Sequence, residues 1–332
     1  MNSLSIIIVN WNTRDLLEDC LQSIRDHLQT LSPQVIVVDN GSSDGSAAMV
    51  ESHFPEVRLL ASPTNLGFAR ANNLGLQEAS GDFLLLLNPD TRVGEGAIEG
   101  LLGTMIADPS IGIAGPQLIH ADGSKQNSIS NDPSLLTELT YKRLLRIFFP
   151  RKYPGKEHGL THPLQVEGVI GACMLVRREA FLEVGPMDED YFLFLEESDW
   201  CRRMRQRGWK VVHDPRFTVV HLQGKSVGKV PTEARVEFWK SRYLFFRKHY
   251  GPGVEAMLKG GLMAKLALSC LINALPTLAT GFFLARPREK LLLNLRLMEW
   301  HLRGCPPGWG LQRRGSSRNS EAVSTLPDGG LL

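Results

Sequence analysis

Apolar residues in the first hundred positions form short uninterrupted runs, separated by stretches in which they recur at helical spacing. The runs cover residues 5–10, 35–38, 57–60 and 83–87 and consist largely of Val, Ile and Leu. Runs of this length predict strands buried on both faces. Helices are predicted between them, one after Thr13 as N-cap and two more near residues 46–53 and 67–79. This alternation predicts an α/β fold with a mostly parallel central sheet flanked by helices.

The pattern after residue 100 is less regular but still predicts strands and helices. Residues 111–119 predict two strands, because Gly115 and Pro116 interrupt the run. Residues 166–176 predict a strand broken by glycine, 209–213 and 217–221 predict two more strands, and 233–250 predict a helix. The catalytic domain is therefore expected to span residues 1–250.

Polar residues follow three of the predicted strands at the point where each ends. The first strand ends in Asn10 and Asn12, the fourth in Asn88-Pro89-Asp90, and the second in a longer polar set comprising Asp39, Asn40, Ser42 and Asp44. Each could form an ordinary turn. The carboxyl ends of parallel strands share one edge of the sheet, however, and ligands bind at that edge. Three polar ends on one edge therefore favour a binding site.

A divalent cation that holds a diphosphate would suit these strand ends. Mg²⁺ and Mn²⁺ take few protein ligands and leave positions open for phosphate oxygens. Asp90 is the predicted carboxylate ligand, with His221 as its partner because it also ends a predicted strand and precedes a loop rich in glycine and small polar residues, 223–228. Asp39 is suited to accept the imide N–H of a uracil or thymine base.

An acidic cluster of Glu196, Glu197 and Asp199 opens a predicted helix. Acids at a helix N-terminus also suit the helix dipole, which is the structural alternative. Neighbouring like charges raise at least one pKa, and a carboxylate so tuned can take a proton from a hydroxyl nucleophile. With a cation to stabilise a departing diphosphate, these groups predict transfer of a group from a nucleoside diphosphate to an alcohol.

Six segments, in order over residues 4–228, resemble the inverting family 2 glycosyltransferases with the GT-A fold, and within them a rhamnosyltransferase-like branch. The segments are "SIIIVNWN", "VVDNGSSDGS", "NLGFARANNLG", "LLLLNPDT", "GACMLVRREAFLEVGPMDEDYFLFLEESDWCRR" and "HLQGKSVG". The resemblance implies that Asn10 and Asp39 hold the pyrimidine, with Asp44 nearby. It assigns the diphosphate and sugar side to Asn65, Gly67, Arg70 and Asn73.

The resemblance also bears on the cation and the base. Asp90 matches the metal-binding acid of the family's Asp-x-Asp motif, whose first position is Asn88 here, so a second ligand such as His221 becomes more important. The base falls at Glu197, where the family has Asp, with Asp199 and Glu196 as alternatives. The predicted activity is metal-dependent transfer of a sugar, rhamnose being one candidate, from a UDP- or dTDP-sugar to a hydroxyl of a glycan or polyprenyl-linked acceptor of the cell surface.

Two other functions fit a similar sheet. A nucleotidyltransferase would attack the α-phosphate, but such enzymes carry a glycine-rich basic loop after the first strand, where Asn10-Trp11-Asn12 stands here. A non-catalytic nucleotide-sugar binding protein would leave the acidic cluster as a helix N-terminus only. The carboxylates together with His221 favour the enzyme.

Composition adds limits to this interpretation. The chain has 332 residues, 43% hydrophobic and 22% charged, which is ordinary for a folded protein, and a net charge of +2, which gives no indication of nucleic-acid binding. Its five cysteines show no CxxC or metal spacing, and the N-terminus lacks the basic region of a signal peptide. A reduced cytoplasmic protein is expected.

The last third predicts helices that contact a membrane. Residues 262–285 are long and apolar enough to span a bilayer, although Lys265 and Pro276 disfavour a clean span, and basic residues follow at once. The favoured interpretation of residues 251–303 is a helical extension lying on the inner face of the plasma membrane. Alternatives are a helical subdomain on the catalytic core or a homodimer contact. The basic, apolar stretch 140–156 fits either a membrane surface or a solvated helix. The polar tail, 304–332, is expected to be disordered.

Overall fold

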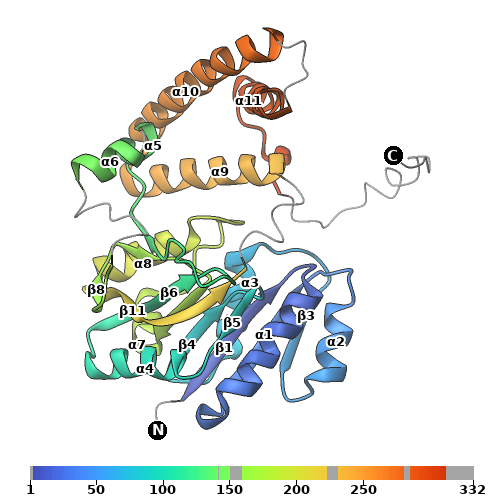
Figure 1. Ribbon diagram of the computed structural model, residues 1–332, viewed down its shortest axis with the longest axis vertical. Helices are drawn as coiled ribbons and strands as arrows, with labels where there is room; N and C mark the ends of the chain where they lie inside the picture. Colours follow the sequence, from blue (N-terminus) through green and yellow to red (C-terminus); the bar gives the residue numbers. More distant parts are fainter. Residues whose placement is uncertain (1–2, 141, 150–158, 223–230, 280–284, 312–332) are drawn as a thin grey trace.

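The computed structural model describes residues 3–140, 142–149, 159–222, 231–279 and 285–311 (Figure 1). Its first half alternates strand and helix as predicted. The elements are β1 (Leu4–Asn10), α1 (Arg14–His27), η1 (Gln29–Leu31), β2 (Gln34–Asn40), α2 (Ser46–His53), β3 (Arg58–Ser62), α3 (Phe68–Glu78), β4 (Phe83–Leu87), β5 (Thr91–Val93) and α4 (Ala97–Ala107). The predicted 223–228 loop and most of the polar tail lie outside the described residues.

The second half continues the sheet and then becomes helical. Its elements are β6 (Ile111–Ile119), β7 (Ile129–Ser130), α5 (Leu135–Leu139), α6 (Lys142–Phe148), β8 (Leu164–Gln165), β9 (Gly168–Val169), β10 (Cys173–Arg177), α7 (Arg178–Val184), α8 (Glu196–Gln206), β11 (Lys210–His221), α9 (Pro231–Tyr250), α10 (Pro252–Ala279), α11 (Ala285–Leu302) and η3 (Pro307–Trp309).

One large sheet organises the catalytic part, in the order β3-β2-β1-β4-β10-β6-β11-β5. Strands β3, β2, β1 and β4 are parallel neighbours, and β6 runs parallel to β11, whereas β10 and β5 are antiparallel to the strands they pair with. The predicted α/β class with a mostly parallel sheet is confirmed. Strands β1, β2, β4, β6 and β11 therefore end at one edge.

Two apolar cores cover the two faces of this sheet. Because side chains alternate along a strand, Ile6 and Ile8 of β1 pack toward α1, α2 and α4, whereas Ile7 and Val9 pack toward α3, α7 and α8. All seven residues of β1 are buried. The continuous apolar runs in the sequence therefore reflect burial on both faces.

Two of the strand predictions were wrong in detail. Residues 111–119 form the single strand β6, and β10 pairs only with Ile113 and Ala114, so Pro116 lies beyond that pairing and its missing N–H breaks no hydrogen bond with β10. Residues 210–221 likewise form one strand, β11, with a register shift between Asp214 and Thr218. The irregular segment between Asp214 and Thr218 is a bulge within one strand. Sequence periodicity alone cannot distinguish such a bulge from the end of a strand.

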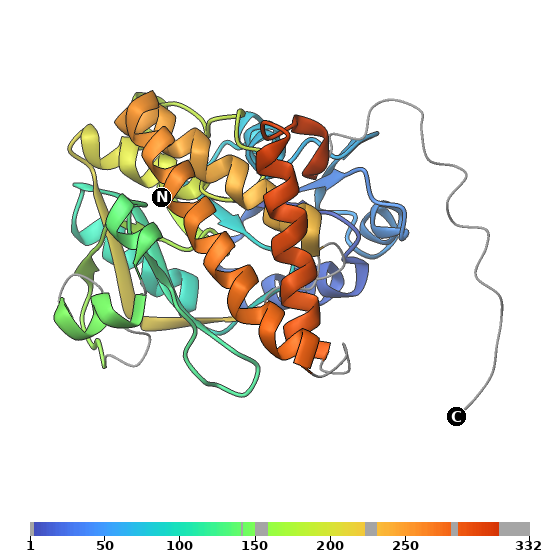
Figure 2. The ribbon, with the colours of Figure 1, turned by 90° about the horizontal axis from the view of Figure 1, so that it is seen from above.

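A layer of three helices lies above the carboxyl edge of the sheet. Helix α9 is next to the catalytic part, and α10 and α11 form an antiparallel pair on its other side (Figures 1 and 2). The three helices share a third apolar core that includes Phe245, Leu258, Leu262 and Trp300. Helix α9 therefore packs with the two helices that follow it, while the predicted boundary at residue 250 stays a prediction.

Candidate active site

The ends of β1 and β2 form a hydrogen-bonded polar cluster. Asn10 and Asp39 face each other in the strand register, and the Asn10 amide donates to Asp39 Oδ1 at 3.1 Å and to Ser42 Oγ at 3.2 Å. The second Asp39 oxygen accepts from the backbone N–H of Ser42. Thr13, predicted as an N-cap, makes no capping bond; its hydroxyl donates to Asn10 Oδ1 at 2.7 Å. These bonds fix the orientation of the Asp39 carboxylate.

The loops that follow the two strands are also joined to each other. Asn12 accepts from the Ser43 backbone through its side chain and donates its own N–H to Ser42 Oγ. Asp44 accepts from the backbone of Arg14 at 2.9 Å and from Ser46. Burial acts to raise the Asp44 pKa, but these hydrogen bonds outweigh it and keep the pKa below its usual value. Asp44 is therefore committed to holding the loop of β2 on the start of α1.

Asn40 and Asn65 connect the end of β2 to the loop before α3. Asn40 donates to Asn65 Oδ1 at 3.0 Å and to the carbonyl of Gly67, and accepts from the Leu66 backbone. Gly67 has φ +85°, and a Cβ there would lie 2.5 Å from the carbonyl oxygen of Phe192. A glycine is therefore required where this loop meets the segment that leads into α8.

Arg70 and Asn73 on α3 face the same segment. The Asn73 side chain exchanges hydrogen bonds with the backbone of Met187 and donates to Glu189 Oε1 at 3.1 Å. Arg70 Nε lies 3.8 Å from Glu189 Oε2. The predicted diphosphate-side residues are thus placed together, and Glu189 is a neighbour that the sequence argument did not single out.

The turn after β4 brings Asp90 to His221. Strand β5 begins at Thr91 and pairs with β11, so that Thr91 lies opposite His221 and the Leu222 N–H donates to the Asp90 carbonyl. His221 Nε2 lies 3.4 Å from Asp90 Oδ1, with both side chains largely buried. Among the described residues, Asn88 Oδ1 is buried without a hydrogen-bond partner. An imidazole nitrogen, a carboxylate and an unsatisfied amide oxygen fit a divalent cation that also binds phosphate oxygens.

Gln126 fixes the tautomer of His221. Its Nε2 donates to the backbone carbonyl of His221, which turns its Oε1 toward His221 Nδ1 at 3.0 Å. Since a carbonyl oxygen only accepts, Nδ1 carries a proton, and in the neutral ring Nε2 is then the nitrogen whose lone pair is on the side of Asp90. No local pattern marks Gln126, because its contact with His221 spans 95 positions. In the described parts of the chain, no group of three or more His, Cys, Asp or Glu gathers as a closed metal site.

The three acids at the start of α8 have different surroundings. Asp199 is buried and accepts from Arg203 Nε and His249 Nε2, each at 2.7 Å. Burial acts to raise the Asp199 pKa, but the His249 hydrogen bond and the Arg203 charge hold it below its usual value. Burial raises the pKa of Glu196 well above its usual value, and the charge of Glu197 adds to this; Glu196 Oε2 has no partner among the described residues.

Glu197 is the acid with neither a salt bridge nor full burial in the described structure. Burial raises its pKa, and the hydroxyl of Ser198 is 3.5 Å from its Oε1. Phe194 and Leu195, directly before α8, have φ values of +73° and +67°. Such angles cost non-glycine residues about 1–3 kcal/mol each and are found where a side chain must be aimed. The strained turn fixes the start of α8 and therefore the direction in which the side chains of Glu196 and Glu197 point.

A short connection links these acids to the turn after β4. The Asn88 N–H donates to the carbonyl of Ala172 at 2.9 Å, and a Cβ on the preceding Gly171 would lie 3.5 Å from the Cβ of Glu197. Asn88 and Glu197 thus lie on either side of one dipeptide. The structure brings together the ends of β1, β2, β4 and β11 and the first turn of α8, as the carboxyl-edge argument predicts.

Solved structures with this arrangement are GT-A glycosyltransferases. The crystal structure of GalNAc-T7 with UDP, GalNAc and Mn²⁺ superimposes with a TM-score of 0.51 at 18% identity, covering 67% of this chain and 44% of that one. The mannosyltransferase PcManGT from Pyrobaculum calidifontis in complex with GDP-Man and Mn²⁺ gives 0.50 at 17% identity, covering 90% and 86%. The fold class is therefore GT-A.

Sequence relatives narrow the class to a family. Residues 5–185 match the sequence model of Glycosyl transferase family 2. An N-acetylglucosaminyl-diphospho-decaprenol L-rhamnosyltransferase from Mycobacterium tuberculosis is 32% identical over 281 residues, which is 80% of this chain and 91% of that protein. The low-salt glycan biosynthesis hexosyltransferase Agl10 from Haloferax volcanii is 26% identical, covering 75% of each chain. The chain belongs to glycosyltransferase family 2 and is a glycosyltransferase.

Proposed function

We propose that this glycosyltransferase moves a sugar, with rhamnose the first candidate, from a UDP- or dTDP-sugar to a hydroxyl of a lipid-linked glycan, with inversion and with a divalent cation. The observation that carries the proposal is the joining of Asn88 and Glu197 through Gly171 and Ala172. The turn that carries Asn88 and the first turn of α8 contact the same dipeptide, which supports a cation site and a base close to each other. The relatives named above support the sugar and the acceptor class.

Each residue has a distinct part in this reaction. Asp39 accepts the imide N–H of the pyrimidine, held in position by Asn10. Asp90, His221 and Asn88 would hold Mg²⁺ or Mn²⁺, which supplies positive charge to the departing diphosphate. Glu197 takes the proton from the acceptor hydroxyl. As it does so, the hydroxyl oxygen bonds to the anomeric carbon from the face opposite the leaving group, and the bond from that carbon to the diphosphate oxygen breaks.

We also propose that the helical layer binds the inner face of the plasma membrane. Exposed apolar side chains gather at Leu268, Leu271, Ile272, Leu275 and Leu278 on one face of α10, and Leu144, Ile147, Phe148 and Phe149 are exposed on and just after α6. Arg288 and Lys290 at the start of α11 are exposed and suit anionic lipids. An apolar face beside exposed cations is the pattern of a helix lying in the bilayer interface.

Association without spanning is supported by how α10 is packed. Helix α10 is long and apolar enough to cross a membrane by length and composition, and its most apolar window of 18 residues has a mean hydropathy of 1.6. Its first half is docked, however: Leu258, Leu262 and Leu266 are buried, and Lys265 Nζ donates to the Glu138 carbonyl at 2.9 Å. The part after Leu266 is only about 20 Å long at roughly 1.5 Å per residue, against a hydrocarbon core of about 30 Å.

The test is a transfer assay with purified full-length protein. A panel of UDP-, dTDP- and GDP-sugars is first screened by thermal shift with and without Mn²⁺, and the stabilising donor is then assayed with N-acetylglucosaminyl diphosphofarnesol as acceptor. We expect a dTDP- or UDP-sugar to stabilise the protein only with Mn²⁺. Product analysis should show the anomeric configuration inverted.

The variant Glu197→Gln tests the base. We expect it to lower kcat by about 10²–10⁴-fold, the usual contribution of a general base, while the Kd for UDP with Mn²⁺ stays within twofold of wild type. The pH profile provides a second readout: wild-type kcat should rise with pH through the raised Glu197 pKa, because only the deprotonated carboxylate accepts a proton. Near-normal turnover by Glu197→Gln would exclude Glu197 as the base and move the assignment to Asp199.

A further inference from the structure

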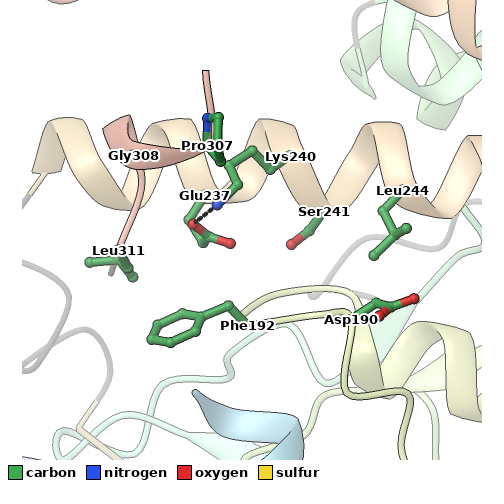
Figure 3. Close-up of a pocket in the computed structure, with 9 residues that line it drawn as sticks. All are labelled: Asp190, Phe192, Glu237, Lys240, Ser241, Leu244, Pro307, Gly308 and Leu311. Atoms are coloured by element: carbon green, nitrogen blue, oxygen red, sulfur yellow. Dashed lines mark hydrogen bonds and ion pairs between the residues drawn. The ribbon is translucent and has the colours of Figure 1, made fainter. Parts of the chain in front are cut away.

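A cavity of about 580 Å³ lies between α9 and the segment that leads into α8. Glu237, Ser241 and Leu244 point into it from α9, Asp190 and Phe192 form the opposite wall, and Leu311 lies at one end (Figure 3). Its volume is within the range of about 300–1,000 Å³ typical of small-molecule sites. None of these residues belongs to the predicted nucleotide, cation or base positions.

The polar groups of the cavity suit a neutral, hydroxyl-rich ligand. Lys240 contributes its ammonium to the α9 wall, where the buried Glu237 carboxylate holds it at 2.8 Å, and Asp190 contributes an exposed carboxylate to the opposite wall, so the lining offers an ammonium and a carboxylate. Adjacent sugar hydroxyls, which both donate and accept, can bond to such a pair. The Phe192 ring provides an apolar surface for the C–H face of a pyranose. A purely apolar ligand would leave the ion pair without replacement hydrogen bonds, and a diphosphate would meet the Glu237 and Asp190 carboxylates.

The walls of the cavity are shared with the active site. Phe192 packs against Gly67, whose loop is bonded to Asn40 at the end of β2, so Phe192 lines the cavity and also contacts the predicted donor side. On the other wall, Ser241 Oγ donates to the Leu193 carbonyl at 2.7 Å. The chain runs from Leu193 through only three further residues to Glu197. A ligand in this cavity therefore lies across one loop from the donor and beside the segment that carries the base.

We propose that this cavity binds the acceptor saccharide and directs its hydroxyl toward Glu197, an inference that rests on the glycosyltransferase activity proposed above. The cavity lies between the catalytic part and α9. Helix α10, which carries the exposed apolar face, lies on the other side of α9 (Figure 1). An acceptor whose lipid stays in the bilayer can thus place its sugar under α9. The α9 wall lies outside the six segments by which the sequence resembles its family, whereas Asp190 and Phe192 lie within the fifth of them.

Two variants of the full-length protein test the site. Leu311→Trp fills the cavity from its end, where Leu311 is partly exposed and a larger side chain does not disturb the core. Glu237→Gln keeps the side-chain shape but removes the charge. The matched control is Leu182→Trp, because Leu182 is 69% exposed on α7 and away from the cavity. The Kd of N-acetylglucosaminyl diphosphofarnesol and the Kd of UDP with Mn²⁺ are measured by calorimetry, and the acceptor KM by transfer.

We expect Leu311→Trp and Glu237→Gln each to raise the acceptor Kd and KM at least tenfold, with the UDP Kd unchanged and Leu182→Trp like wild type. Unchanged acceptor Kd values in both variants would overturn the proposal, as would a wild-type protein that does not bind the acceptor probe. An equal loss of UDP affinity would also overturn it, because the cavity would then belong to the donor. Cavity-dependent acceptor binding without transfer from any nucleotide sugar would support the saccharide site and refute the proposed activity.

Discussion

Replacing Gln126 by leucine tests whether His221 is held ready for a cation. Gln126 is 4% exposed and His221 is 7% exposed, so water cannot replace the lost bonds. Leucine removes the acceptor that faces His221 Nδ1 and the donor that faces the His221 carbonyl. The imidazole then loses the contact that keeps the proton on Nδ1 and the Nε2 lone pair on the side of Asp90.

The size of the effect follows from what is left unpaired. Removal of a hydrogen-bonding partner that orients a metal-ligating histidine weakens metal binding by about 10- to 100-fold, which corresponds to about 1.4–2.8 kcal/mol. The unsatisfied His221 carbonyl and Nδ1–H also lower the free energy of unfolding by about 1–3 kcal/mol. Metal affinity and stability should therefore both fall, and the two have to be measured separately.

The assay measures the Kd of Mn²⁺ by electron paramagnetic resonance in the presence of UDP, and Tm is measured in parallel. Gln117→Leu is the matched control, since buried Gln117 donates to Leu118 O, Gln126 O and Ser128 Oγ, and no hydrogen bond joins it to His221 in the described part of the chain. We expect a similar loss of Tm in both variants and weaker Mn²⁺ binding only in Gln126→Leu. Equal Mn²⁺ affinity in Gln126→Leu and wild type, or an equal loss in Gln117→Leu, would refute the reasoning.

Two further predictions concern the membrane and the acidic cluster. The double variant Leu271→Glu, Leu275→Glu should reduce flotation with anionic vesicles by a hundredfold or more at unchanged Tm, since each leucine buried in the membrane contributes about 1.5–3 kcal/mol. Concentration-dependent dimerisation of the wild type without flotation would assign this face to a second copy instead. Glu196→Gln should raise Tm, and the gain should be larger at about pH 8 than at about pH 5. The folded protein keeps the proton on Glu196 at pH values where the unfolded chain has released it. The free energy of unfolding of the wild type therefore falls as the pH rises from the unfolded pKa toward the raised folded pKa. A gain that is equal at both pH values would contradict this.

The short-range features of the fold were predictable because they depend on local patterns. The runs of β1, β2 and β4 are buried on both faces, and the alternation of strand and helix leaves a parallel sheet as the simplest arrangement. The carboxyl-edge rule then placed Asn10, Asp39 and Asp90 at the same edge of the sheet without any knowledge of contacts. The errors at residues 111–119 and 210–221 arose where a proline or a bulge interrupts periodicity inside a strand that the neighbouring strands keep continuous.

The distinction among the three acids came only from the tertiary structure. In the sequence, Glu196, Glu197 and Asp199 form one charge cluster. In the fold, the His249 side chain arrives from α9, fifty positions away, and bonds to Asp199, so that Glu196 and Glu197 are the two acids of the cluster without a salt bridge among the described residues. Helical phase also turns Glu196 inward, where it is 4% exposed.

The sequence by itself determined the α/β order, the edge of the sheet that carries the chemistry, and the residue types available there, because strand burial and helix periodicity are written in neighbouring positions. Only the tertiary structure decided how those residues meet. Strand β5 crosses to β11 although β10 and β6 lie between β4 and β11 in the sheet, and this pairing brings Asp90 to His221. Gln126 and the cavity under α9 likewise arise from contacts between distant segments, whose geometry no local pattern contains.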